Sequence, residues 1–217
     1  MINNHIMLPQ RTYRMNILDI YLDFTCPYSY IGYHRIAEAV RLNAIAPQNI
    51  QYRAFQLNPN LPEAGIPRTT YRERKFGSME ESRRRDTIVL NIARNEGLKI
   101  NFDNISLTPN TRRAHRAIKI VEAQKRDSSA LYDKIFSAYF TKGQDIGDTQ
   151  ILIKLGAELD ITLTEEQLNN KDLDKTINDD IADAHSVGLT GVPFIVNSKD
   201  GTHISVTSAV YALMNNA

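Results

Sequence analysis

The stretch that decides the fold is LDIYLDFTCPYS, residues 18–29. Apolar side chains alternate along its first part, which predicts a half-buried strand; they are Leu18, Ile20, Leu22 and Phe24. Pro27 then suits the first position of a helix, which the apolar spacing continues to about Leu42. The sequence therefore places Cys26 where a strand passes into the N-terminus of a helix.

Cys26 is the only cysteine in the 217 residues. A helix N-terminus carries unpaired N–H groups and a partial positive charge of about one half, which stabilises an anion. A free cysteine has a pKa of about 8.5, and this position lowers it to roughly 3.5–7.5. We therefore expect a reactive thiolate at Cys26. The alternative is an inert cysteine buried in a core, where free cysteines are common.

Composition narrows the class of protein. The formal net charge of +1 gives no electrostatic case for nucleic acid. No apolar run approaches the ~20 residues of a membrane helix. A lone cysteine excludes an internal disulfide and any C-x-x-C zinc or redox pair, so we expect no metal site, no tightly bound cofactor and a reducing, cytoplasmic setting. Residues 1–14 lack the features of a signal peptide, and we expect a disordered extension there.

The order of predicted elements indicates an α/β protein. A second strand is expected at residues 50–57, giving a βαβ unit with a parallel crossover. Residues 62–187 have almost entirely helical spacing. Strand patterns return at 192–196 and 203–206, separated by the turn signal at 200–201, and a short helix closes the chain. We therefore expect one domain from 15–61 and 188–217, with 62–187 as a helical insertion subdomain whose apolar face also allows a homodimer.

Two features of the insertion are specific enough to test. Helix boundaries are predicted by Asp148 as a cap, by Thr164 with Gln167 as a capping box, and by Gly97 and Gly188 as stops. The segment 71–85 is rich in charge of both signs. We interpret that segment as a solvated helix face rather than a basic patch for an anionic partner.

Pro193 stands at the start of the predicted strand 192–196. A proline is tolerated at a first strand position because it has no N–H to donate. In a βαβ–ββα sheet this strand can lie beside the one that delivers Cys26, so that Pro193 faces the helix N-terminus. This topology favours a cis bond before Pro193. It also leaves backbone groups of Thr190 to Val192 able to pair with an extended peptide or glutathione.

Together these motifs resemble thioredoxin-fold proteins of the DsbA type, in the FrnE-like branch. The resemblance runs from about residue 15 to 206 and rests on motifs in one order: DFTCP at 23–27, YIG at 30–32, FQLNP at 55–59, NT at 110–111 with AHR at 114–116, AYFT at 138–141, DIGD at 145–148, and GVPF at 191–194. It implies a thioredoxin fold with a mixed central sheet, interrupted by an all-helical insertion. The catalytic residues that we expect are Cys26 as the attacking thiol, Ser29 and Pro193. Those that we expect to bind substrate are Pro27, Tyr28, Asn58, Asn110, His115, Thr190 and Val192.

Position 29 departs from the family pattern. Members of the family usually carry C-x-x-C, whereas this chain has Ser29 in place of the second cysteine. A mixed disulfide at Cys26 then has to be resolved by a second molecule, such as glutathione or a substrate thiol. The Ser29 hydroxyl is expected to donate a hydrogen bond to the Cys26 thiolate and to lower its pKa. Residues 207–210 also lack the glycine-containing turn that is usual in the family.

Three functions stay open at this point. The first is a thiol-disulfide oxidoreductase or isomerase that works through one thiol on protein or small-molecule disulfides, with glutathione as a co-substrate. The second is a glutathione-dependent transferase or isomerase, because CPYS also resembles the SPYS motif of kappa-class glutathione transferases and 2-hydroxychromene-2-carboxylate isomerases. The third is a binding protein or chaperone that uses a cleft between the two subdomains.

Overall fold

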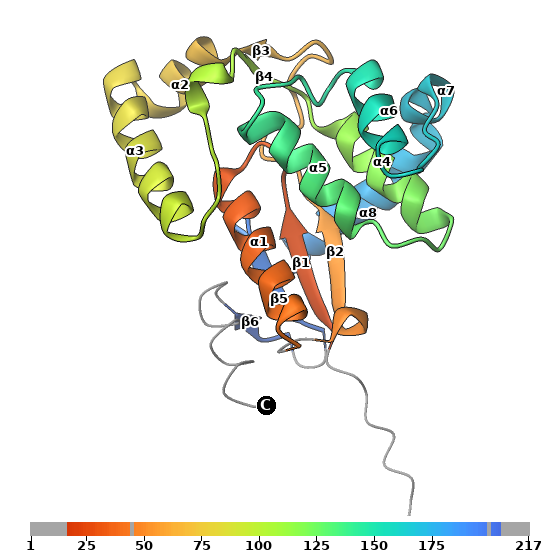
Figure 1. Ribbon diagram of the computed structural model, residues 1–217. Helices are drawn as coiled ribbons and strands as arrows, with labels where there is room; N and C mark the ends of the chain where they lie inside the picture. The colour runs from red at the N-terminus through yellow and green to blue at the C-terminus, as the bar shows by residue number, and fades with distance from the viewer. Residues whose placement is uncertain (1–16, 44–45, 199–200, 205–217) are drawn as a thin grey trace, which may run out of the picture.

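The computed structural model describes residues 17–43, 46–198 and 201–204, around a four-stranded sheet in the order β2-β1-β5-β6 (Figure 1). β1 runs parallel to β2 and antiparallel to β5, and β5 runs antiparallel to β6. The strands are Leu18–Leu22 (β1), Ile50–Ala54 (β2), Phe194–Asn197 (β5) and His203–Ile204 (β6). The βαβ unit and the later hairpin predicted from the sequence therefore share one mixed sheet.

Helices cover both faces of this sheet (Figure 1). Ile20 and Leu22 of β1 belong to the same apolar cluster as buried residues of α1, Pro27–Arg41. Tyr21, between them, instead packs with residues of α8, Asp174–Ser186. The predicted alternation is confirmed, but the prediction of a half-buried strand is wrong. β1 has a strand on each side and helices on each face, so its inward and outward side chains are both buried.

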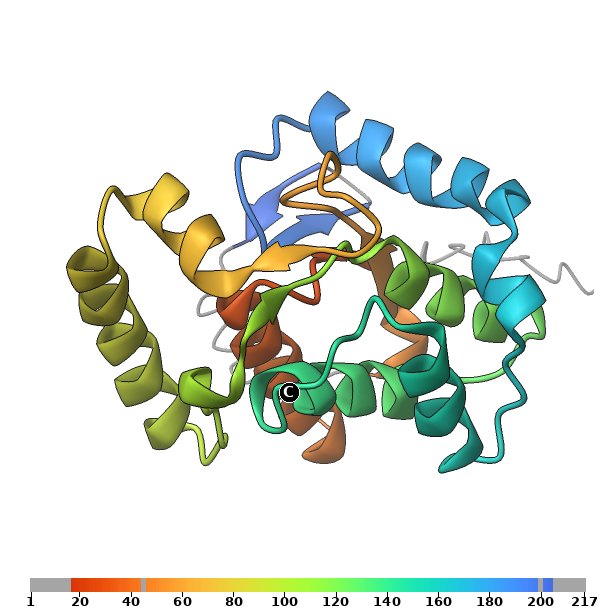
Figure 2. The same ribbon diagram turned by 90° about the horizontal axis from the view of Figure 1, so that it is seen from above.

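The chain between β2 and β5 is mainly helical. Its helices are α2 (Arg68–Phe76), α3 (Met79–Asn95), α4 (Arg112–Ala123), α5 (Ser129–Phe140), α6 (Thr149–Ala157), α7 (Glu165–Asn169) and α8. It also contains an antiparallel pair, β3 (Ile66–Pro67) and β4 (Leu107–Thr108), so the insertion is not all-helical. In Figure 2 this pair lies between α2 and α3 on one side and α4 to α8 on the other.

The predicted helix boundaries are confirmed where local chemistry fixes them. The Asp148 side chain accepts a hydrogen bond from the N–H of Gln150 at the start of α6. Thr164 and Gln167 form a complete capping box at α7. Gly97 and Gly188 follow α3 and α8 with φ of +71° and +75°, a left-handed conformation that glycine adopts without steric cost.

Two predicted strands are shorter in the structure. β2 ends at Ala54 rather than at residue 57, because the N–H of Leu57 turns away to donate to the Asp23 carboxylate at 2.7 Å. β5 begins at Phe194, after Pro193, which has no N–H for the ladder. The predicted extension at 1–14, the end of the last strand at 205–206, residues 207–210 and the C-terminal helix lie outside the described residues.

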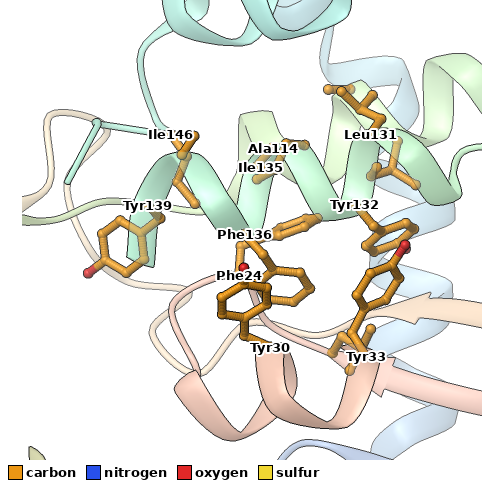
Figure 3. Close-up of a cluster of buried hydrophobic side chains, with 14 of the residues drawn as sticks. Phe24, Tyr30, Tyr33, Ala114, Leu131, Tyr132, Ile135, Phe136, Tyr139 and Ile146 are labelled. Carbon is orange, nitrogen blue, oxygen red and sulfur yellow. The ribbon is translucent and has the colours of Figure 1, made fainter. Parts of the chain in front are cut away.

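One continuous apolar core joins the sheet to the insertion (Figure 3). Phe136 of α5 is fully buried, and its ring centroid lies 4.9 Å from that of Phe24 and 5.2 Å from that of Tyr30. Phe24 and Tyr30 flank the junction between β1 and α1, on either side of Cys26. The insertion therefore contributes directly to the position of that junction.

Candidate active site

Cys26 caps the N-terminus of α1. Its N–H donates to the Asp23 carbonyl at 3.0 Å, and its own carbonyl accepts from the N–H of Tyr30 at 3.2 Å, which begins the helix. The side chain is only 5% exposed, and the thiol donates to the Val192 carbonyl at 3.1 Å. The peptide bond that follows, Val192–Pro193, is cis. The β1–α1 junction and the turn before β5 therefore meet at the thiol.

Burial raises the pKa of the Cys26 thiol, which is opposite to the prediction from the helix N-terminus alone. Hydrogen bonds from the Ser29 side chain and from the N–H groups of Ser29 and Tyr28 lower it, and the negative charge of Asp23 raises it further. The prediction of a resting thiolate is therefore wrong for this conformation. The loss of water around the sulfur outweighs the favourable groups of the helix N-terminus.

Ser29 lies in the first turn of α1, three residues after Cys26, and is fully buried. Its oxygen accepts a hydrogen bond from the N–H of Asp23 at 3.3 Å, which leaves the hydroxyl hydrogen to be donated. A side-chain hydrogen bond from Ser29 is among the groups that lower the pKa of Cys26. This hydrogen bond lowers the pKa of Cys26, as the sequence predicts, but burial raises that pKa by more.

Asp23 is a buried carboxyl group whose charge acts on the thiol, and it is not among the site residues predicted from the sequence. Its oxygens accept from the N–H of Leu57 at 2.7 Å and from the hydroxyl of Thr25 at 3.2 Å. Burial nevertheless raises the pKa of Asp23 above its ordinary value. Since its charge also raises the pKa of Cys26, the two groups disfavour each other's ionised forms. The sequence feature that could have identified Asp23 is its position three residues before Cys26.

The thiol borders a cavity of about 270 Å³ between the start of α1 and the helices α2 and α3. Cys26, Pro27 and Tyr28 form one wall of it. A second cavity, of about 480 Å³, has Tyr28, Val192 and Pro193 in its lining. Tyr28 is 46% exposed and lines both spaces. A larger cavity of about 520 Å³, farther along α1, contains none of the predicted site residues.

The structure brings together most of the predicted site. Around the thiol lie Pro27, Tyr28, Ser29, Val192 and Pro193. Asn58 does not line the 270 Å³ cavity itself. Its amide donates to the hydroxyl of Tyr71 at 3.2 Å, and Tyr71 lines that cavity.

Asn110 and Thr190 lie elsewhere. Asn110 lines a separate cavity of about 200 Å³, where its amide donates to the Leu61 carbonyl and its oxygen accepts from Gln56. Those bonds tie two loops together. Thr190 is exposed, and it lines neither cavity beside Cys26. The structure therefore does not support substrate contacts for either residue.

His115 is a core residue rather than a substrate-binding one. It is 1% exposed, its Nε2 lies 2.9 Å from the Phe55 carbonyl, and its ring packs against Phe24. Burial, reinforced by the positive charge of Lys119, lowers the pKa of His115 to about 3. The imidazole is therefore neutral near pH 7. Helical spacing alone could not show that position 115 faces inward.

Part of the charge-rich segment borders the cavity beside Cys26. Arg72, Lys75, Arg84 and Arg85 all line the 270 Å³ cavity. The Arg72 side chain is only 12% exposed, because it bonds to Ser82 and Asp86 of α3. The interpretation of 71–85 as a solvated helix face is confirmed for most of its charges, since Lys75, Arg84 and Arg85 are exposed, and is wrong for Arg72.

The part of the chain that the structure describes has neither a grouped set of metal ligands nor a membrane-spanning helix. Within residues 17–43, 46–198 and 201–204, no three His, Cys, Asp or Glu side chains are grouped so that they could hold a metal ion. Over the same residues, no helix has the length and apolar character needed to cross a membrane.

The sequence of residues 17–210 matches the family described as the DSBA-like thioredoxin domain. The chain belongs to this family. Its fold is thus a thioredoxin fold with a helical insertion. The Bacillus subtilis (strain 168) protein YwbO is 25% identical over 143 residues, which span 65% of each chain. The match thus covers just under two thirds of that relative.

Solved structures show the same fold at low identity. The probable DsbA oxidoreductase SCO1869 from Streptomyces coelicolor has a TM-score of 0.77 at 22% identity, covering 93% of this chain and 88% of the other. 2-Hydroxychromene-2-carboxylate isomerase gives 0.68 at 16% identity, with 92% and 93% covered. The cytosolic disulfide reductase DsbM from Pseudomonas aeruginosa, also solved with glutathione, gives 0.66 at 16% identity, with 92% and 96% covered.

Proposed function

We propose that this DsbA-like protein catalyses thiol-disulfide exchange through Cys26 alone. The observation that carries the proposal is the position of the single thiol: it caps α1, touches the Val192 carbonyl beside Pro193, and lines a cavity. An inert core cysteine has no need of such a cavity. The proposed catalytic residues are Cys26, with Ser29 and Pro193 placing and tuning its sulfur.

The exchange proceeds in two balanced steps. In the first, Cys26 loses its proton to water, and its sulfur attacks one sulfur of a disulfide. The Cys26–S bond to substrate forms, the substrate S–S bond breaks, and the other half leaves as a thiolate. In the second, an external thiolate attacks the substrate sulfur of this mixed disulfide and releases Cys26 as a thiolate, which takes up a proton from water. Deprotonation in the first step removes the Cys26 hydrogen from the Val192 carbonyl, which then becomes available to substrate.

Ser29 determines which second step is open. A hydroxyl cannot attack the mixed disulfide, so an external thiol must resolve it. Glutathione suits this role, and its presence in one structure of DsbM supports the choice. A continuous supply of free thiols favours a reducing compartment such as the cytoplasm.

The test is incubation with oxidised glutathione, followed by intact mass. We expect one glutathione to add to the wild type and none to Cys26→Ser, and reduced glutathione to remove it. Ser29→Cys is the matched gain-of-function variant. Its second thiol should displace glutathione from Cys26, so that the adduct no longer accumulates and an internal disulfide forms. A wild type that stays unmodified after prolonged incubation at pH 8 contradicts the proposal.

Ser29→Ala tests the hydrogen bond to sulfur. The variant removes a group that lowers the pKa of Cys26, so that pKa should rise further, as followed by thiolate absorbance. A hydrogen bond to a charged group contributes about 1.5 kcal/mol, so exchange at pH 7 should slow about tenfold. Ser186→Ala, on the exposed end of α8, is the control. An unchanged titration curve for Ser29→Ala would remove Ser29 from the mechanism.

Burial of the thiol supports a second candidate, a glutathione-dependent transferase or isomerase. Because burial raises the pKa of Cys26, the resting sulfur is a poor nucleophile. In this candidate function glutathione supplies the attacking thiolate, as the shared fold with 2-hydroxychromene-2-carboxylate isomerase allows. The same mass experiment separates the two functions. Tight binding of glutathione to a protein whose Cys26 never forms an adduct supports the second, and indifference to glutathione supports a binding protein.

A further inference from the structure

The cavity beside Cys26 has a strongly positive wall. Four basic side chains and one acidic side chain line it, which gives a formal charge of +3. These five residues are Arg72, Lys75, Arg84, Arg85 and Asp86. The whole chain carries only +1, so positive charge is concentrated along the cavity that Cys26 also lines.

The positive charges are held around one aromatic ring. The Arg72 guanidinium lies 4.3 Å from the Phe76 centroid, that of Arg85 lies 4.9 Å away, and the Lys75 ammonium lies 5.7 Å away. Cation–π contacts of this kind fix a cation without neutralising it. Phe76 itself lines the cavity. The wall is therefore positioned by α2 and α3, and its net charge faces the space beside the thiol.

Nearby carboxylates do not cancel this charge. Asp86 is shared between Arg72 and Arg68, and Arg68 lies outside the lining. Glu81, also outside the lining, is shared between Arg84 and Arg85. Counting both of these outer residues adds one positive and one negative charge, so the total stays at +3. Lys75 donates to the Tyr71 hydroxyl, a neutral group.

The size of the space also restricts the substrate. A volume of 270 Å³ lies just below the range of about 300–1,000 Å³ that is typical of small-molecule sites. It suits one small molecule whose sulfur meets Cys26 while its acidic groups meet the exposed heads of Lys75 and Arg85.

From these observations we propose that the α2–α3 wall makes Cys26 selective for small anionic thiols and disulfides, those carrying carboxylate groups. This inference rests on the proposed exchange function and names its substrate class. A field of this sign raises the local concentration of anions and opposes cations, and the effect weakens with salt.

The experiment uses three disulfides of different charge: 5,5′-dithiobis(2-nitrobenzoate), a dianion; 2,2′-dithiodipyridine, neutral; and cystamine, a dication. Each forms a mixed disulfide with Cys26 and releases one thiol. The rate constant of Cys26 with each disulfide is divided by the rate constant of the neutral thiol N-acetylcysteine amide with the same disulfide. This corrects for the intrinsic reactivity of each disulfide. We expect the corrected value for the dianion to exceed that for the dication roughly tenfold or more at low salt. The ratio should shrink at high salt.

Lys75→Gln combined with Arg85→Gln removes two charges from the wall. Because both charges favour the dianion and oppose the dication, the double variant should reduce the dianion-to-dication ratio by roughly four- to twentyfold. Lys134→Gln with Lys175→Gln removes the same charge from residues that do not line this cavity, and should keep the wild-type ratio. A slower reaction that is equal for all three disulfides would reflect only a changed thiol, and would overturn the inference.

The two proposals fail in different ways. Equal corrected rates for the three disulfides overturn charge selectivity and leave exchange intact. If Cys26 reacts with none of them, the exchange function is wrong. Anion binding is then measured by calorimetry with S-methylglutathione, which cannot exchange. Binding that is weakened in the Lys75→Gln/Arg85→Gln variant and kept in the control pair upholds the wall as an anion site, and absence of binding to the wild type overturns it.

Discussion

At Cys26, two effects of opposite sign act on one sulfur. The N–H groups of Ser29 and Tyr28 and the Ser29 hydroxyl favour the thiolate, while burial and the Asp23 charge favour the thiol. Burial is the largest of these. In the proposed exchange, a substrate that separates the thiol from the Val192 carbonyl would change this balance, because its own groups would replace that contact. Under that proposal the reactivity of Cys26 depends on whether the cavity is occupied.

His115 gives a prediction about pH. Its pKa of about 3 in the folded chain lies below the ordinary 6.5 of the unfolded chain. As pH falls below 6.5, the unfolded chain binds a proton that the folded chain does not, so stability present above pH 6.5 is lost. Between pH 7 and pH 5 the loss is about 2 kcal/mol. Urea unfolding at both pH values should show this loss in the wild type and not in His115→Gln.

The matched control is His34→Gln, on the outer part of α1, which should keep the wild-type difference. The glutamine at 115 can still donate to the Phe55 carbonyl, so the variant is expected to fold. An equal loss in the wild type and in His115→Gln would show that other groups cause the acid sensitivity.

Among the elements, α2 and α3 depend on one buried carboxylate. Asp86 of α3 accepts from Arg68 at 2.7 Å and from Arg72 at 2.5 Å, and all three side chains are 12% exposed. Breaking a buried ion pair by removing one partner costs about 3–5 kcal/mol. Asp86→Asn should therefore lower the free energy of unfolding by about 3 kcal/mol and loosen the wall beside Cys26.

Urea unfolding measures this change, with Asp179→Asn as the control. Asp179 pairs with Lys175 on the surface of α8, and such pairs contribute about 0–1 kcal/mol. If Asp86→Asn costs no more than the control, the two arginines are held by other contacts.

Sequence could predict those elements whose ends are fixed locally. Pro27, Gly97 and the Thr164–Gln167 pair act within a few residues of themselves, and each prediction is confirmed. The predictions that were wrong depended on which side of a helix packs against the rest of the protein. Arg72 turns toward α3, and His115 turns into the core, because of partners on other elements.

The prediction that the pKa of Cys26 is lowered was wrong for the same reason. A helix N-terminus can be identified from Pro27, but the burial that outweighs it comes from the insertion and from the turn at Val192. The family resemblance predicted the fold correctly. It could not show that α2 and α3 bring four basic side chains to the cavity.

At the scale of the whole molecule, the thioredoxin sheet and the insertion share one core. Buried residues of β1 and α1 belong to the same cluster as those of α4, α5 and α6. In Figure 3 the rings of Phe24, Tyr30 and Tyr33 lie against α5. Two parts that share a core cannot unfold independently without exposing it. The insertion is therefore part of the structure that holds the active site.

Phe136→Ala tests this coupling. Removing a fully buried ring costs about 3–5 kcal/mol, so the urea midpoint should fall well below that of Leu42→Ala, a control at a 52% exposed position. Because Phe136 supports Phe24 and Tyr30 on both sides of Cys26, the folded variant should also react more slowly with oxidised glutathione. Circular dichroism and tyrosine fluorescence should report one coincident transition in the wild type, the variant and the control. Two separate transitions in the wild type would mean that the insertion folds as an independent unit, and that its contacts at Phe136 do not position the thiol.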